Sequence, residues 1–193
     1  MTTISIIVCG VGGQGILTAS DIIGQVALLG GFDVKKSEVH GMAQRGGSVV
    51  TAVRFGKKVY SPLISRGMAD FILAFEKLEA LRQLPQLKRD GSVIVNDLEI
   101  MPMPVLIGKA EYPVRIIESI RGFARNVDLI NATKLAVEAG DIRTTNTVLL
   151  GALARRLDFD RDLWLDAIGI RFPKRLIKIN RQAFDLGFNS VCR

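Results

Sequence analysis

The segment Gly10-Val11-Gly12-Gly13-Gln14-Gly15 stands between two apolar stretches and decides how the start of the chain folds. Residues 4–9, ISIIVC, are apolar and rich in β-branched side chains, which is typical of a buried parallel strand. Residues 16–29 carry apolar side chains at helical spacing. A strand, a glycine turn and a helix in this order predict a loop whose backbone N–H groups can hold an anion at the helix start.

The glycine spacing also satisfies the dinucleotide-binding pattern G-x-G-x-x-G at Gly10, Gly12 and Gly15. Such a site needs an acidic residue at the end of the second strand, about 20 residues beyond the glycines, to bind the ribose hydroxyls. Asp33 lies at the start of the predicted second strand, and Glu38 lies in the loop that follows it. The pattern therefore favours NAD(P) or FAD only weakly.

Composition indicates a globular protein that builds its own core. With 193 residues, 48% of them hydrophobic, we expect one domain over residues 1–193. No stretch reaches the length of a transmembrane helix, and the N-terminus lacks a basic signal-peptide region. Cys9 and Cys192 form no C-x-x-C pair and no Cys/His cluster, so we expect no iron–sulfur cluster or structural zinc on this chain. These features favour the cytoplasm.

The charge is positive and uneven. The chain carries a net charge of +7, and residues 143–193 hold ten Lys or Arg against five Asp or Glu. A basic surface suits an anionic partner, although a solvated face explains the same charge equally well. Aromatic residues make up only 6% of the chain and no nucleic-acid motif occurs, so we expect no nucleic-acid partner.

Strand and helix patterns alternate along most of the chain. We expect strands at residues 32–36, 48–55, 69–75, 92–96 and 127–130, with 48–55 forming a hairpin with a short run at 58–60. Helices are expected near residues 76–84, 115–125 and 133–139, and three more follow residue 144, the last ending with Gly187 at its C′ position. The pattern predicts an α/β fold, a three-layer α/β/α arrangement with a mostly parallel mixed sheet and a helical C-terminal third.

Three further features are candidates for a site. Arg45-Gly46-Gly47 offers a guanidinium group beside free backbone N–H groups, but a tight turn with Arg45 paired to Glu38 explains it too. His40, the only histidine, is more typical of a hydrogen-bonding anchor than of a base, and alone it makes no metal site. Asn146 lies where it could cap a helix.

A fourth feature is an amide on an apolar helix. Asn180 needs partners there, either a backbone group or another subunit. No nucleophile with a base and no close pair of carboxylates is visible in the sequence. The residues alone therefore predict a binding or scaffolding domain rather than a self-sufficient enzyme.

Four motifs in order make the sequence recognisable: residues 10–15, residues 45–47, residues 146–152 (NTVLLGA) and residues 180–184 (NRQAF). Together they resemble the γ-type domain of the 2-oxoacid:ferredoxin oxidoreductases, over nearly the whole chain. The fuller loop 38–47, EVHGMAQRGG, is similar to that of family members acting on indolepyruvate, an aryl pyruvate.

The resemblance implies a role in a larger complex that decarboxylates a 2-oxoacid oxidatively, transfers the acyl group to coenzyme A and reduces ferredoxin. It implies that thiamine diphosphate and the iron–sulfur clusters belong to a large α subunit, and that this chain is inactive alone. It leaves open a γ subunit acting on pyruvate, 2-oxoglutarate or a branched-chain 2-oxoacid, a free-standing nucleotide- or CoA-binding module, and a homodimer when isolated. No membrane partner is expected.

The resemblance also selects site residues, which we expect to contact coenzyme A, thiamine diphosphate or the partner subunit. No catalytic residue and no metal ligand is expected. The expected binding residues are Gly10, Gly12, Gly13, Gln14, Gly15, His40, Gln44, Arg45, Gly46, Gly47 and Asn146.

Overall fold

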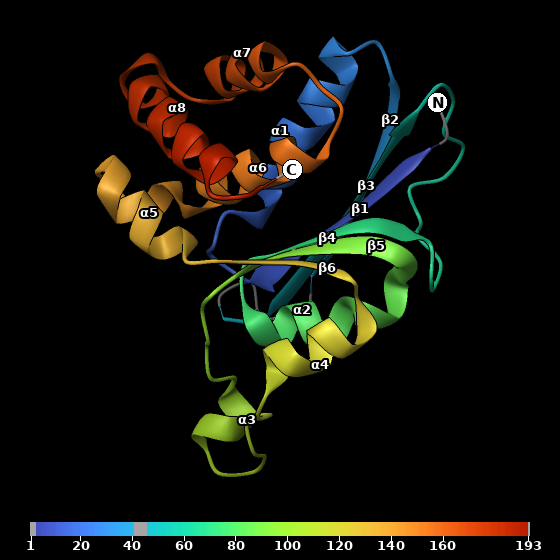
Figure 1. Ribbon diagram of the computed structural model, residues 1–193, viewed down its shortest axis with the longest axis vertical. Coiled ribbons are helices and arrows are strands. Elements are labelled where there is room, and N and C mark those ends of the chain that lie inside the picture. Colours follow the sequence, from blue (N-terminus) through green and yellow to red (C-terminus); the bar gives the residue numbers. More distant parts are fainter. Residues whose placement is uncertain (1–2, 41–45, 193) are drawn as a thin grey trace.

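A mixed sheet forms the middle of the molecule (Figure 1). The computed structural model describes residues 3–40 and 46–192, and in this part of the chain the sheet has six strands in the order β2-β3-β1-β4-β5-β6. β1, β4, β5 and β6 are parallel to one another, whereas β3 runs antiparallel to both of its neighbours. The strands are β1 (Ile4–Val11), β2 (Asp33–His40), β3 (Ser48–Gly56), β4 (Ala69–Ala74), β5 (Leu87–Asn96) and β6 (Asn126–Ile130).

Helices cover both faces of the sheet, as Figure 1 shows, so the expected three-layer α/β/α fold is confirmed. α1, α5, α6, α7 and α8 lie on one face, and α2 and α4 lie on the other. The helices are α1 (Ile16–Leu29), α2 (Lys77–Gln83), α3 (Met103–Leu106), α4 (Ile116–Phe123), α5 (Ala132–Ala139), α6 (Thr145–Arg156), α7 (Arg161–Arg171) and α8 (Lys174–Asn189). No helix in the described ranges is long and apolar enough to cross a membrane.

The position of β1 in the middle of the sheet explains why polar and apolar residues do not alternate in the apolar stretch at residues 4–9. Its side chains point alternately to the two faces, and both faces are covered. Ile6 and Val8 belong to the larger core, under α1 and α5–α8, while Ile7 and Cys9 belong to the smaller core, under α2 and α4. A strand buried on both sides therefore reads as continuously apolar.

Four local expectations were wrong. Glu38 lies inside β2, where it pairs with Thr51, and not in a loop after the strand. Residues 58–60 form no strand, and β3 pairs instead with β1 and β2. The strand expected at residues 92–96 begins earlier, because β5 starts at Leu87 and passes through Asp90 and Gly91 with a register shift. Gly187 lies inside α8, which continues to Asn189.

Asp33, at the start of β2, holds the segment that follows β3. The Val59 backbone N–H donates a hydrogen bond to the Asp33 carboxylate at 2.9 Å, and Lys35 forms an ion pair with it at 3.0 Å. The Val59 N–H and Lys35 together lower the pKa of Asp33 from 3.8 to about 2. Asp33 and the glycine loop lie at opposite ends of the strands. Asp33 pairs with Gly56 at one end of β3, and Gly10 pairs with Val49 near the other end. It therefore cannot serve as the ribose-binding acid of a dinucleotide site.

Asp33→Asn tests this pKa. The carboxyl pKa is lower in the folded protein than in the unfolded chain, so its stabilisation is present above pH 3.8 and is lost as the pH falls towards 2. We expect the free energy of unfolding, measured by urea titration at successive pH values, to fall less steeply in the variant than in the wild type across this window. Parallel curves would contradict the assignment.

Candidate functional site

The glycine loop lies where neighbouring parallel strands send their helices to opposite faces of the sheet. β1 leads into α1 on one face, and the adjacent β4 leads into α2 on the other. In open α/β sheets, ligands bind in the crevice outside the carboxyl ends of strands at such a switch point. The topology therefore places the predicted anion loop at the carboxyl ends of the strands, where this class of fold usually binds its ligands.

Gln14 holds the loop in shape. Its Oε1 accepts a hydrogen bond from the Val11 backbone N–H at 2.6 Å, and its Nε2 donates to the Phe75 carbonyl, at the end of β4, at 3.2 Å. Gly13 and Gly15 have φ values of +102° and +85°, in the left-handed region that favours glycine. The Gln14 side chain therefore ties the loop to the next strand instead of extending into solvent.

At Gly10 and Gly15, neighbouring atoms also leave no room for a side chain. A Cβ on Gly10 would lie 2.7 Å from the Phe75 Cβ, and one on Gly15 would lie 2.9 Å from Asn146 Nδ2. Asn146 is buried in the first turn of α6, whose N-cap is Thr144, so it is not the cap that the sequence suggested. The structure thus brings Asn146 against the glycine loop.

Gly46 and Gly47 contact the glycine loop at residues 10–15. The Gly12 N–H donates to the Gly47 carbonyl at 2.8 Å, and the Gly46 N–H approaches the Gly12 carbonyl at 3.5 Å. The backbone of His40 pairs with Val49 at the same edge of the sheet. Gln44 and Arg45 fall outside the described residues. The structure therefore brings together eight of the predicted binding residues: the five of the glycine loop, with Gly46, Gly47 and Asn146. The end of β2, which carries His40, lies at the same end of the sheet.

Two cavities flank the loop. One, of about 410 Å³, is lined by Gly12, Gly13, Gly15, Ile16, Leu17, Thr18 and Val49. The other, of about 370 Å³, is lined by Gly13, Gln14, Gly15, Phe75, Leu98, Thr133, Ile142, Arg143 and Thr145. The first turn of α1 contains no acidic residue and its N-cap makes no side-chain hydrogen bond, so its N–H groups and the helix dipole suit an anion.

Arg143, beside the second cavity, already has an ionic partner. Its guanidinium forms an ion pair with Asp141 and donates hydrogen bonds to both oxygens of that carboxylate. These contacts lower the pKa of Asp141 and raise that of Arg143. The Arg143 side chain is 82% exposed, so solvent screens the pair and it adds little to stability.

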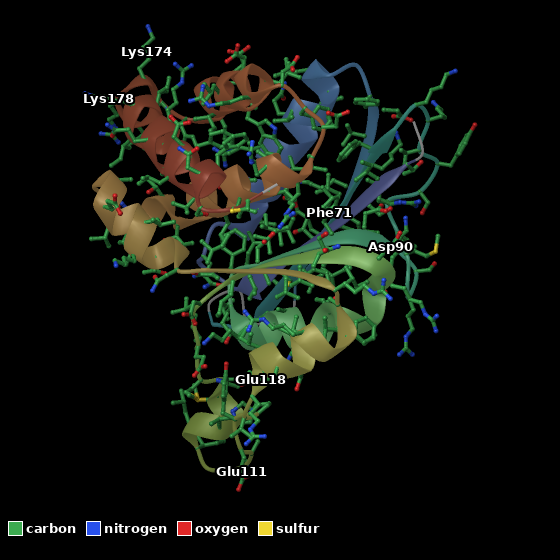
Figure 2. The ribbon with its side chains drawn as sticks, viewed as in Figure 1. Phe71, Asp90, Glu111, Glu118, Lys174 and Lys178 are labelled. Carbon is green, nitrogen blue, oxygen red and sulfur yellow. The ribbon has the colours of Figure 1, made fainter. Side chains whose placement is uncertain are left out.

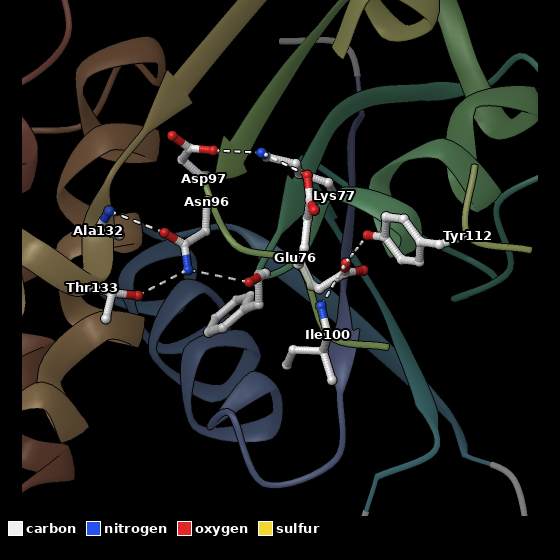
Figure 3. Close-up of polar contacts among 10 residues, drawn as sticks. Glu76, Lys77, Asn96, Asp97, Ile100, Tyr112, Ala132 and Thr133 are labelled. Carbon is white, nitrogen blue, oxygen red and sulfur yellow. Dashed lines mark hydrogen bonds and ion pairs between the residues drawn. The ribbon is translucent and has the colours of Figure 1, made fainter. Parts of the chain in front are cut away.

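Two buried polar residues at strand ends were missed by the sequence reasoning (Figure 3). The Asn96 amide, at the end of β5, donates to the Phe75 carbonyl at 3.3 Å and accepts from the Ala132 N–H at 3.0 Å. Glu76, two residues beyond the end of β4, accepts hydrogen bonds from the Tyr112 hydroxyl at 2.7 Å and the Ile100 N–H at 3.2 Å. The available signal was a polar residue at or just beyond the end of a buried strand.

Glu76 also caps α2, because its Oε2 accepts from the Glu79 N–H at 2.9 Å. Burial and the nearby carboxylate raise the pKa of Tyr112 well above its ordinary value, so Tyr112 remains a hydrogen-bond donor. Burial, followed by the charges of Glu79 and Glu76, raises the pKa of Cys9 as well. Cys9 is therefore an inert buried thiol, as its place in a core strand predicted.

Asn180 finds its partners inside the chain. Its Oδ1 accepts from the Thr147 hydroxyl at 2.7 Å, and its Nδ2 donates to the Leu176 carbonyl at 2.8 Å. These bonds satisfy both ends of the buried amide and join α6 to α8. Asn180 is thus explained without a subunit contact.

Comparisons with known proteins agree with this architecture. The model of the pyruvate ferredoxin/flavodoxin oxidoreductase family matches residues 5–190. Indolepyruvate oxidoreductase subunit IorB of Thermococcus kodakarensis is 44% identical, covering 99% of this chain and 97% of that protein. The common subunit gamma of the pyruvate/ketoisovalerate oxidoreductases of Pyrococcus abyssi is 29% identical, over 76% of this chain and 74% of that protein.

A solved structure has the same fold. The gamma subunit of a keto/oxoacid ferredoxin oxidoreductase from Geobacter sulfurreducens superposes with a TM-score of 0.73 at 23% identity, covering 97% of both chains. Because the family model spans nearly the whole sequence, the chain belongs to the pyruvate ferredoxin/flavodoxin oxidoreductase family.

Proposed function

We propose that this chain is the small subunit of an oxidoreductase that converts indolepyruvate, or a related aryl pyruvate, to the aryl-acetyl-CoA with reduction of ferredoxin. The observation that carries the proposal is the 44% identity to an indolepyruvate oxidoreductase subunit over 99% of the chain, against 29% identity to a gamma subunit of pyruvate/ketoisovalerate oxidoreductases. The catalytic partner in this proposal is a large α subunit.

The residues of this chain do not fit an iron–sulfur cluster. Within residues 3–40 and 46–192, no group of three or more His, Cys, Asp or Glu side chains is arranged to hold a metal ion. Cys9 is buried in β1, whereas Cys192 is exposed at the other end of the sequence. We propose that the clusters and thiamine diphosphate belong to the large subunit, and that the role of this chain is to bind and position the substrates.

The glycine loop is the part of this chain that we assign to an anion. Gly10, Gly12, Gly13, Gln14 and Gly15 form a rigid loop at the start of α1, and Gly46, Gly47 and Asn146 surround it. With His40, Gln44 and Arg45 of the adjoining segment, these residues are proposed to face the phosphates of coenzyme A where the two subunits meet. The N–H groups and the guanidinium supply the complementary charge.

Co-expression with the large subunit under anaerobic conditions tests the function. The complex, purified through a tag on this chain, would be assayed for CoA-dependent dye reduction with indolepyruvate and with pyruvate. We expect a brown complex with a higher kcat/KM for indolepyruvate. A preference for pyruvate would assign the chain to a sibling enzyme, and a colourless chain that elutes alone and binds a nucleotide would refute the proposal.

Arg45→Ala tests the binding assignment separately. A charge-assisted hydrogen bond to a phosphate contributes roughly 1.5–3 kcal/mol, so we expect the apparent KM for coenzyme A to rise about tenfold or more, with kcat at saturating coenzyme A little changed. Arg66→Ala, which removes an exposed arginine near the opposite edge of the sheet, is the matched control. An unchanged KM in Arg45→Ala would show that Arg45 does not bind coenzyme A.

A further inference from the structure

One segment stands away from the two layers of helices. Residues 100–115, here called the arm, leave the sheet after β5, form the short helix α3 and return at the start of α4 (Figure 1). Figure 2 shows Glu111 at the outer end of the arm, while Glu118 lies nearer the body on α4. No residue of α3 is buried. The α3 part of the arm therefore projects into solvent, whereas Tyr112, near the end of the arm, packs against the smaller core.

The arm is unusually apolar for an exposed segment. Residues 100–108, IMPMPVLIG, include no charged side chain, although 23% of the whole chain is charged. Five large apolar side chains of the arm are between 41% and 84% exposed: Met101, Met103, Leu106, Ile107 and Val114. Single exposed apolar residues need no explanation, but a group of them on one projection marks an interaction surface.

The arm is also held in a fixed position. The Ile100 N–H, at its start, and the Tyr112 hydroxyl, near its end, both donate to Oε1 of the buried Glu76. Pro102 and Pro104 restrict the backbone between these points, and the Lys109 N–H closes the turn by donating to the Pro104 carbonyl at 2.8 Å. A segment fixed in this way loses little conformational entropy when a partner covers it.

We propose that the arm docks into an apolar groove of the large subunit, an inference that rests on the proposed function and names its contact surface. Residues 100–108 carry no charged side chain, so this stretch offers no complementary charge to an acidic carrier protein or to nucleic acid. A symmetric contact between the arms of two copies would pair two short projections, whereas a stable interface needs about 800 Å² on each partner. A groove in a larger subunit encloses the projection on several sides, and the two methionines adapt to its shape.

Leu106→Glu and Met103→Glu test the arm, each in the full chain. Both side chains are exposed, so the isolated variants should melt like the wild type. We expect each variant to bind the purified large subunit at least about tenfold more weakly, because a charge would be buried in the groove. Ile170→Glu is the matched control: Ile170 is equally exposed but lies on α7, across the sheet, and this variant should bind within twofold of the wild type.

The outcomes separate the two proposals. Wild-type affinity in both arm variants, with the wild-type chain binding the large subunit, would overturn the arm assignment alone. If the isolated wild type is a dimer that Leu106→Glu converts to a monomer without weakening the large-subunit complex, the arm joins two copies of this chain and the assignment is also overturned. A wild-type chain that does not bind the large subunit would refute the proposed function, and this inference with it.

Discussion

Gly187→Ala is expected to destabilise the protein by about 3 kcal/mol or more, because the added methyl group would overlap the backbone of α6. Gly187 lies on α8 where it crosses α6. A Cβ there would be 1.8 Å from the Val148 carbonyl oxygen, and a Cβ on the facing Gly151 would be 2.0 Å from the Phe184 carbonyl oxygen. Both obstacles are backbone atoms, so no side-chain rotation can relieve the clash, and the helices must move apart.

The separation would disturb the larger core. Trp164 and Phe184 are fully buried, and their rings lie 6.0 Å apart beside this crossing. The matched control is Gly122→Ala: Gly122 is exposed on α4, and a Cβ there would meet nothing within 4 Å. Since alanine favours helix over glycine by roughly 1 kcal/mol, we expect that variant to be as stable as the wild type or more stable. Urea unfolding of the full chain measures the free energy of unfolding of both variants. A value for Gly187→Ala within about 0.5 kcal/mol of the wild type would contradict the close approach of α8 to α6.

The crossing also explains two of the sequence motifs that identify the family. Thr147 and Gly151 belong to the motif at residues 146–152, and Asn180 and Phe184 belong to the motif at residues 180–184. The Thr147–Asn180 hydrogen bond and the Gly151–Phe184 contact join α6 to α8. Apart from Asn146, which meets the glycine loop, these motifs therefore serve helix packing rather than ligand binding.

The sequence predicted local elements better than it predicted pairings. The first strand, glycine loop and helix were correct because their signals lie within one continuous stretch. The partner of the strand at 48–55 was wrong, because β3 pairs with β1 and β2 and the Asp33 carboxylate occupies the Val59 N–H. Gly187 was assigned to a helix end, because only the facing helix shows why a glycine is needed inside α8.

The candidate site was predicted in part for the same reason. Glycines in a loop are visible as a motif, so the glycine loop and Gly46–Gly47 could be found before their contact was known. Asn96 and Glu76 look like ordinary polar residues after strands, and their role depends on segments 21 to 36 residues away. The binding roles of all the predicted site residues, including Gln44 and Arg45, stay predictions.

Glu76→Ala is expected to destabilise the protein by about 3 kcal/mol and to release the arm. The change removes the α2 cap, worth about 1 kcal/mol, and leaves the Ile100 N–H and the Tyr112 hydroxyl without their acceptor. Urea unfolding measures the loss, and hydrogen exchange over residues 100–115 should rise more than over the sheet. Glu111→Ala, an exposed carboxylate on the same arm, is the control and should change stability by less than about 0.5 kcal/mol.

A double-mutant cycle with Tyr112→Phe separates the clamp from the helix cap. Alone, Tyr112→Phe should cost about 1 kcal/mol because Glu76 loses one donor. In the Glu76→Ala background the same change should cost almost nothing, because the hydroxyl then has no acceptor to lose. Additive losses would show that Glu76 and Tyr112 act independently, and that the arm owes its position to its prolines rather than to the buried carboxylate. A coupled pair, by contrast, means that the stability of α2 and the placement of the arm depend on the same side chain.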